Sequence, residues 1–128
     1  MAATARNITD LTGRVAVVIG ATSGLGRTIA LGLAQHGADV VPTGRRKDQV
    51  RKVCSEIEAL GRRSLALTSD VTNRDSLVAL RDCVIAHFGP VDVLVNAAGH
   101  TFRKPSAEVQ DHEWAGLLDT NLTGAFRA

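Results

Sequence analysis

Three glycines at positions 20, 24 and 26 stand between two apolar stretches, and glycines in that arrangement can hold a phosphate. The residues before them, Val15 to Ile19, read as a buried strand, and an Ala/Leu-rich run that follows reads as a helix. A helix beginning near Gly24 would offer unpaired N–H groups and the positive end of its dipole to an anion. A Cβ at Gly20, Gly24 or Gly26 would obstruct the turn, the phosphate or the packing of the helix. The pattern favours a pyrophosphate site, and an ordinary tight turn is the alternative.

Two arginines follow the second apolar run of the sequence. In parallel sheets that bind a dinucleotide, the residues at the end of the second strand distinguish NAD from NADP. An acid at the end of that strand binds the ribose hydroxyls of NAD, whereas a base accommodates the 2′-phosphate of NADP. Here Gly44 occupies the acidic position, and Arg45 and Arg46 follow it. Glycine leaves room, and a guanidinium can bind two phosphate oxygens at once. The sequence therefore predicts NADP(H) in preference to NAD(H). The alternative is that Arg45, Arg46 and Lys47 form a solvated helix start.

The elements that must position these residues alternate between strand and helix. Strands are predicted at 15–19, 39–43, 64–68 and 91–95, and apolar residues recur with helical spacing between them. Right-handed crossovers in such a series produce a parallel sheet with helices on both faces. The prediction is an α/β, Rossmann-type doubly wound sheet, here partial, with four strands in the order 3-2-1-4. Residues 1–128 are predicted to form a single domain.

Smaller signals refine the elements. Gly37, Gly61 and Gly89 each follow a helical pattern and predict helix ends, and the Thr72-Asn73 pair predicts the start of the third helix. Proline cannot donate to a ladder, so Pro42 is expected near the end of its strand, where pairing lapses.

A last helix and an unprotected strand complete the expected fold. The helix is predicted to begin near Asp111 and to carry Trp114, Leu118 and Leu122 on one side. The strand at 91–95 is predicted to be a bare apolar edge, prone to pair with another chain or to aggregate.

Four separated signals, each at the end of an expected strand or in the last helix, resemble the short-chain dehydrogenase/reductase family. They are the glycine turn, "DV" at 70–71, "NAAG" at 96–99 and Asn121 in "TNLTGAF". The resemblance extends from Leu11 onward. Ile19 and Ala97 depart from the commonest family pattern, which has Thr and a second Asn there, and so lack hydrogen bonds that help to fix the turn.

The resemblance implies NAD(P) binding and hydride transfer between nicotinamide and an alcohol or ketone. It assigns the pyrophosphate turn to Gly20, Thr22, Ser23, Gly24, Leu25 and Gly26, the adenine to Asp70 and Val71, and the ribose side to Asn96, Ala97 and Gly99. The alternatives are an ordinary loop acid at Asp70 and a plain turn at Asn96. Another Rossmann-type fold, such as a methyltransferase, would need neither "NAAG" nor the arginines of the second strand.

The catalytic group is largely missing. In the family, a Tyr assisted by a Lys four residues on transfers the proton and a Ser holds the substrate oxygen, but this sequence contains no Tyr. Of that group only Asn121 is present, and the resemblance implies that it anchors a proton-relay water. The alternative is an asparagine that bonds backbone. The chain is expected to be the N-terminal, cofactor-binding part of a longer enzyme and inactive alone. A catalytically silent dinucleotide-binding fragment that assembles with a partner is the second hypothesis.

Composition and charge limit the partners, the location and the metal sites that can be expected for this chain. A net charge of +2 does not favour nucleic acid or an anionic membrane as partner. No secretory signal or span of about 18 apolar residues is visible, so a cytoplasmic location is expected. Cys54 and Cys83 fall in separate helical patterns without metal-ligand spacing, so no metal site is predicted. The resemblance implies a homo-oligomer in the full-length form.

Overall fold

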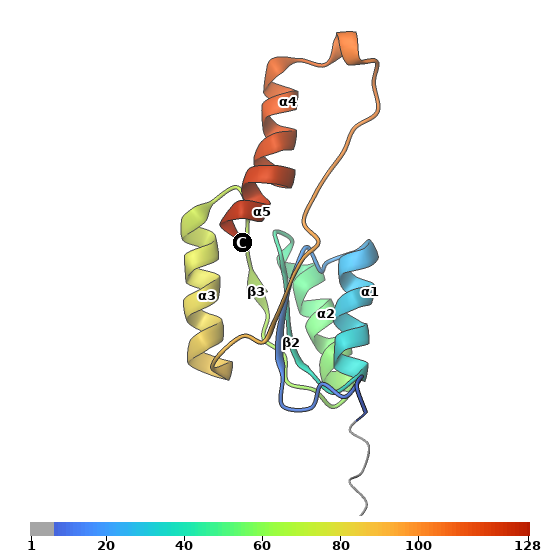
Figure 1. Cartoon of the computed structure of the whole chain (residues 1–128), viewed down its shortest axis with the longest axis vertical. Coiled ribbons are helices and arrows are strands. Elements are labelled where there is room, and N and C mark those ends of the chain that lie inside the picture. The colour runs from blue at the N-terminus through green and yellow to red at the C-terminus, as the bar shows by residue number, and fades with distance from the viewer. Residues whose placement is uncertain (1–6) are drawn as a thin grey trace, which may run out of the picture.

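A computed structural model describes residues 7–128 as one parallel sheet with surrounding helices (Figure 1). The sheet has four strands in the order β3-β2-β1-β4, which confirms the predicted 3-2-1-4 topology. The elements along the chain are β1 (Val15–Ile19), α1 (Gly24–Gln35), β2 (Asp39–Gly44), α2 (Lys47–Ala59), β3 (Leu67–Thr68), α3 (Arg74–Phe88), β4 (Val93–Asn96), a 3₁₀ turn (Ser106–Glu108), α4 (Asp111–Leu118), a π-helical turn (Asp119–Thr123) and α5 (Gly124–Arg127).

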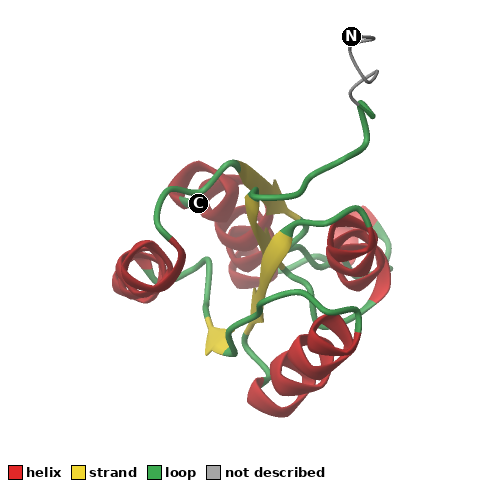
Figure 2. Cartoon of the chain, turned by 90° about the horizontal axis from the view of Figure 1, so that it is seen from below, coloured by secondary structure: helices red, strands yellow, loops and turns green. Residues whose placement is uncertain are grey.

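Alternate residues of the central strands supply two separate cores. Ala16 and Val18 of β1 point to one face, where they pack with Ala30 of α1 and Ile57 of α2. The neighbouring β1 residues point to the opposite face, where Leu80 and the rest of the buried side of α3 cover them. Figure 2 shows the strands running between these helices. The prediction of helices on both faces is confirmed, and burial on both faces explains the nearly continuous apolar composition of β1.

The third strand is shorter than predicted, because the prediction of 64–68 reduces to Leu67–Thr68. Pro42 gives a physical reason. Strand N–H groups alternate in direction, and the N–H of Val40 donates to the carbonyl of Arg63 on the β3 side. The nitrogen of Pro42, two residues on, faces the same side and has no hydrogen to donate. Pairing therefore lapses only toward β3. Pro42 lies two residues before the end of β2, Gly44. The expected lapse of pairing there was wrong on the β1 side, because β2 pairs with β1 from Asp39 to Thr43.

The predicted helix ends are confirmed. Gly37, Gly61 and Gly89 follow or cap α1, α2 and α3 with φ of 100°, 79° and 82°. At the start of α3, the Asn73 side chain accepts a hydrogen bond from the Ser76 N–H at 3.2 Å. These caps fix where α3 begins, immediately after the loop at the end of β3.

The last helix begins at Asp111 as predicted, but its apolar side is not buried. Trp114 is 55% exposed and Leu122 is 64% exposed, because α4 projects beyond the sheet (Figure 1). The π-helical turn at Asp119–Thr123 also changes the helical spacing after Leu118. Contact with the body of the fold comes later, at Gly124, where an added Cβ would lie 2.7 Å from a methyl group of Val71.

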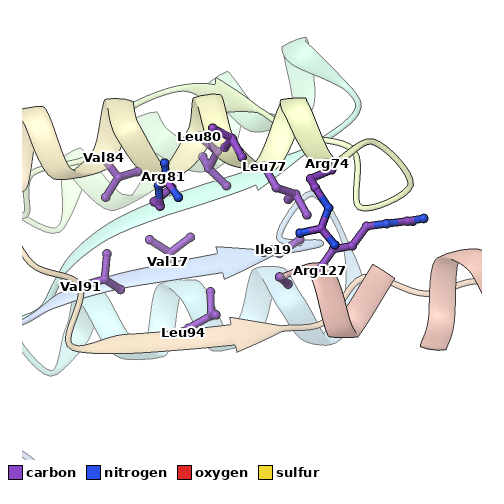
Figure 3. A pocket seen from close by; sticks show the side chains of 12 residues that line it. Val17, Ile19, Arg74, Leu77, Leu80, Arg81, Val84, Val91, Leu94 and Arg127 are labelled. Atoms are coloured by element: carbon purple, nitrogen blue, oxygen red, sulfur yellow. The ribbon is translucent and has the colours of Figure 1, made fainter. Parts of the chain in front are cut away.

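The fourth strand begins two residues later than predicted and forms one edge of the sheet. It pairs with β1 alone within residues 7–128, and Leu94 is 51% exposed. Beside it, apolar side chains of β1, α3 and β4 line a groove of about 280 Å³ with Arg74, Arg81 and Arg127 around it (Figure 3). Among the described residues no helix combines the length and the hydropathy that crossing a bilayer requires.

Asp92 joins the N-terminal ends of β1 and β4. Its carboxylate accepts one hydrogen bond from the N–H of Val15 and another from the guanidinium of Arg14, each at 2.9 Å. The bond from Val15, and then that from Arg14, hold the pKa of the Asp92 carboxyl below its usual value. A lowered native pKa stabilises the fold above the unfolded value of about 3.9, and this contribution disappears as the pH falls through the native pKa.

An Asp92→Asn variant should therefore unfold at a lower temperature than the parent chain at pH 7. The difference should begin to narrow below about pH 4, where the unfolded chain becomes protonated, and should close as the pH falls through the lowered native pKa of Asp92. Thermal unfolding followed by circular dichroism from pH 3 to pH 7 measures both effects. Asp82→Asn is the control, because Asp82 pairs with Arg81 on an exposed surface. Equal midpoints for the two variants at pH 7 would contradict the role of Asp92.

Candidate functional site

A cavity of about 500 Å³ lies where the carboxyl ends of the strands meet. It combines residues from the segments after all four strands and from the π-helical turn. The predicted site residues that line it are Gly20, Thr22, Ser23, Arg45, Arg46, Asp70, Val71, Ala97 and Gly99. The predicted site residues outside its lining are Gly24, Leu25, Gly26, Asn96 and Asn121. The structure thus places most of the sequence-predicted residues around one hollow.

The β1–α1 turn fits tightly between its neighbours, and two glycines make this possible. A Cβ on Gly20 would lie 2.6 Å from the backbone carbon of Ala97, in the segment after β4. A Cβ on Gly26 would meet the carbonyl oxygen of Gly20 and would lie 2.8 Å from its carbonyl carbon. Because backbone atoms cannot move aside without moving a strand end, these two glycines set the close packing of α1 on the sheet.

The N-terminus of α1 is left open. Ser23 occupies the N-cap position, but its side chain makes no capping hydrogen bond, and the first turn carries no acid. Gly24 has a φ of 55°, and a Cβ there would meet nothing within 4 Å. Leu25 is 81% exposed. The first-turn N–H groups and the helix dipole are therefore available to an anion that approaches from outside.

Arg46 extends from the N-cap position of α2 to the β1–α1 turn. Its Nη2 donates to Thr22 Oγ1 at 3.0 Å and to Ser23 Oγ at 3.3 Å. Arg45 also lines the cavity, and its positive charge acts on the carboxyl of Asp70. Both arginines are exposed. The cavity lining therefore includes one guanidinium bonded to the glycine turn and a second one whose charge reaches the acid that follows β3.

Asp70 is an ionised carboxylate that accepts hydrogen bonds from the protein through one of its two oxygens. Its Oδ1 accepts from Thr72 Oγ1 at 2.7 Å and from the Thr72 N–H at 2.9 Å. These two bonds, and more weakly the charge of Arg45, lower the pKa of the Asp70 carboxyl. Within residues 7–128 no donor to the second carboxylate oxygen is recorded. That oxygen can accept an N–H of a ligand.

Several lining residues lie outside the sequence prediction. Thr43 Oγ1 donates to the carbonyl of Leu67 at 2.6 Å and lies 2.9 Å from Ser69 Oγ, so a buried hydroxyl pair underlies the site. Hydroxyl residues at two strand ends are the sequence signal that could have indicated it. The lining residues not predicted as site residues are Ile19, Gly44, Ser69, Thr72, Ala98, His100 and Thr120.

Asn121 joins the loop after β4 to the π-helical turn. Its Nδ2 donates to the carbonyl of His100 at 2.8 Å, and its Oδ1 accepts from the His100 N–H at 3.0 Å. Both polar atoms of the side chain are thus used by backbone, as the alternative interpretation of this residue predicted. Asn96 makes a similar local bond, accepting from the Ala98 N–H at 3.2 Å.

A second contact fixes the same loop to α4. Lys104 Nζ lies 2.6 Å and 2.7 Å from the two carboxylate oxygens of Glu113. Bonds from Lys104 and from the Gln110 N–H hold the pKa of Glu113 below its usual value. No group of three or more metal-ligating side chains occurs in the part of the chain that the structure describes.

Comparisons with known proteins agree with this geometry. A profile of the short chain dehydrogenase family matches residues 14–128. The chain is 40% identical over 117 residues to 2-dehydro-3-deoxy-D-gluconate 5-dehydrogenase of Escherichia coli strain K12, covering 91% of this chain and 46% of that protein.

Two solved structures are also similar. A short-chain type dehydrogenase/reductase from Mycobacterium marinum matches with a TM-score of 0.90 and 32% identity, over 93% of this chain and 48% of that one. A variant of actinorhodin polyketide ketoreductase with NADPH matches with a TM-score of 0.85 and 39% identity, over 89% and 44%. The chain spans about half the length of the relatives it matches.

Proposed function

The chain belongs to the short chain dehydrogenase family, and we propose that it is the cofactor-binding part of an NADP(H)-dependent oxidoreductase. In this proposal residues 1–128 are a single dinucleotide-binding domain. The longer enzyme transfers a hydride between the nicotinamide and a small alcohol or ketone. The names of the relatives, a sugar-acid dehydrogenase and a polyketide ketoreductase, support that substrate class.

The single observation that carries the proposal is the open N-terminus of α1 beside two arginines. Uncapped N–H groups, an unopposed helix dipole and glycines without side chains suit a pyrophosphate. In the proposed complex Gly20, Thr22, Ser23, Gly24, Leu25 and Gly26 surround the pyrophosphate. Arg45 and Arg46 bind the 2′-phosphate of the ribose.

The adenosine occupies the part of the cavity between the ends of β3 and β4. The free oxygen of Asp70 accepts a hydrogen bond from the adenine amino group, and the backbone of Val71 contacts the ring edge. Asn96, Ala97 and Gly99 form the ribose side. Asn121 is proposed to act in catalysis by anchoring a proton-relay water. Because its side chain bonds the backbone of His100, this role would fall to its backbone.

A catalytically silent dinucleotide-binding fragment that assembles with a partner is the second candidate. The glycine turn and Arg45 serve both candidates equally. Both candidates require NADP(H) to bind. They differ in whether oxidoreduction accompanies that binding in the longer protein.

An Arg45→Ala variant tests the cofactor proposal. Removing one charge-assisted bond of about 1.5–3 kcal/mol should weaken NADPH binding by roughly ten- to a hundred-fold. NADH lacks the 2′-phosphate, so its affinity should change little. Calorimetric titration of the 128-residue chain with each cofactor measures both dissociation constants.

Arg51→Ala is the matched control, because it removes an exposed positive charge that lies within α2 and outside the cavity lining. It should leave both dissociation constants near those of the parent chain. An equal loss for NADPH and NADH in Arg45→Ala would contradict NADP(H) selectivity. A parent chain that binds neither cofactor would contradict the proposed function itself.

A further inference from the structure

The end of β2 and the β1–α1 turn touch through Gly44 and Thr22. Gly44 is buried, and a Cβ built on it would lie 2.8 Å from Thr22 Cγ2 and 3.6 Å from Thr22 Oγ1. A real Cβ does not approach a methyl group so closely, so a side chain at position 44 requires Thr22 to move. Position 44 is also the place at which an acid would bind the ribose hydroxyls of NAD.

Any rotation of the Thr22 side chain also changes its hydrogen bond with Arg46. Its Oγ1 accepts from Arg46 Nη2 at 3.0 Å, while its methyl group faces Gly44. Both groups are attached to the same Cβ, and a β-branched side chain has few staggered positions. A rotation that removes the methyl group from position 44 therefore also displaces the hydroxyl from Arg46.

We propose that Thr22 is a specificity-determining residue for the cofactor and that it acts in two directions. Its methyl group excludes an acidic side chain at position 44, and its hydroxyl positions the Arg46 guanidinium beside the glycine turn. The inference rests on the proposed binding of NADP(H). It adds that the glycine at position 44 and the arginine at position 46 are coupled through Thr22.

A specificity role for Thr22 and a purely structural role predict different effects of substitution. The Thr22–Arg46 bond is exposed, and exposed polar contacts contribute little to stability. Substitutions at Thr22 that keep its size should leave the unfolding midpoint almost unchanged. The ratio of the NADPH and NADH dissociation constants should respond instead.

Thr22→Val and Thr22→Ser test the methyl group and the hydroxyl group of Thr22 separately. Valine keeps a methyl group against Gly44 but cannot accept from Arg46, so NADPH binding should weaken about two- to tenfold more than NADH binding. Serine keeps the hydroxyl, so it should restore NADPH affinity to within about twofold of the parent. Titration of the 128-residue chain with both cofactors measures this, and Arg51→Ala again serves as the charge control.

Substitutions of Gly44 are tested both in the parent chain and in the Thr22→Ser variant. Gly44→Asp alone should weaken both cofactors, because the new side chain meets the methyl group of Thr22. In the Thr22→Ser background the methyl group that lies 2.8 Å from a Cβ at position 44 is absent, so the acid should tighten NADH binding and weaken NADPH binding, changing the ratio of their dissociation constants by about tenfold. Gly44→Ala in the same two backgrounds measures the steric effect alone by its unfolding midpoint, which the serine should partly restore.

The outcomes distinguish the two proposals. A parent chain without saturable binding of either cofactor would remove the proposed function and this inference together. A parent chain that binds NADPH would overturn only the inference if Thr22→Val and Thr22→Ser behave alike. Equal cofactor ratios for Gly44→Asp in the two backgrounds would also overturn it.

Discussion

A Gly26→Ala chain is expected to lose saturable NADPH binding and a substantial part of its stability. The added Cβ would meet the carbonyl oxygen of Gly20, which belongs to the turn that continues β1. Neither partner is a flexible side chain, so relief requires α1 to move away from the sheet. Overpacking of this kind costs about 1–3 kcal/mol, and sometimes more. Urea denaturation and NADPH titration measure the two losses.

Gly32→Ala supplies the control within the same helix. A Cβ at Gly32 meets nothing within 4 Å, and alanine is the better residue in a helix interior, by about 0.5–1 kcal/mol. This variant should be slightly more stable than the parent and should bind NADPH normally. Unchanged NADPH affinity in Gly26→Ala would show that the dinucleotide does not lie in the β1–α1 turn.

Replacement of Ile57 by alanine is expected to have the second large effect, on stability. Ile57 is completely buried where α2 packs against α1 and the sheet. Truncating such a side chain removes its burial and leaves a cavity, at a cost of about 2–5 kcal/mol. A domain of this size is stable by about 5–15 kcal/mol in total, so the loss is a large fraction. Chemical denaturation at pH 7 provides the measurement.

Ile85→Ala is the companion variant, because Ile85 is 50% exposed on α3. Its unfolding free energy should change by less than about 1 kcal/mol. Ile57→Ala that remains folded in buffer should still bind NADPH, since Ile57 lies outside the cavity lining. Similar stability losses for the two isoleucine variants would contradict the position of Ile57 in the core.

The sheet was predictable because strands buried on both faces consist of nearly continuous apolar residues. β1 coincides with its predicted range, and the strand order followed from the alternation of strands and helices. The error at β3 arose from a property of a neighbouring strand. Pro42 withholds one N–H toward residues 64–66, an effect that becomes visible only once the pairing partner is known.

The site was predictable where chemistry depends on residue type at a strand end. Glycine, aspartate and arginine at such positions indicated the cavity, whereas contacts between distant side chains left no pattern. The bond from Arg46 to Thr22 and the packing of Thr22 on Gly44 depend on how two strand ends meet in space. The exposed side of α4 was also unpredictable, since helical spacing shows an apolar side without showing what covers it.

The two attachments of the loop after β4 determine how that region opens. His100 is tied to Asn121 and Lys104 to Glu113, so loop and helix hold each other at separate points along both. Detaching either attachment alone releases little chain, because the other still holds the loop against the helix. Amide protons from about residue 100 to residue 121 should consequently exchange with solvent as one cooperative unit, on a timescale of their own.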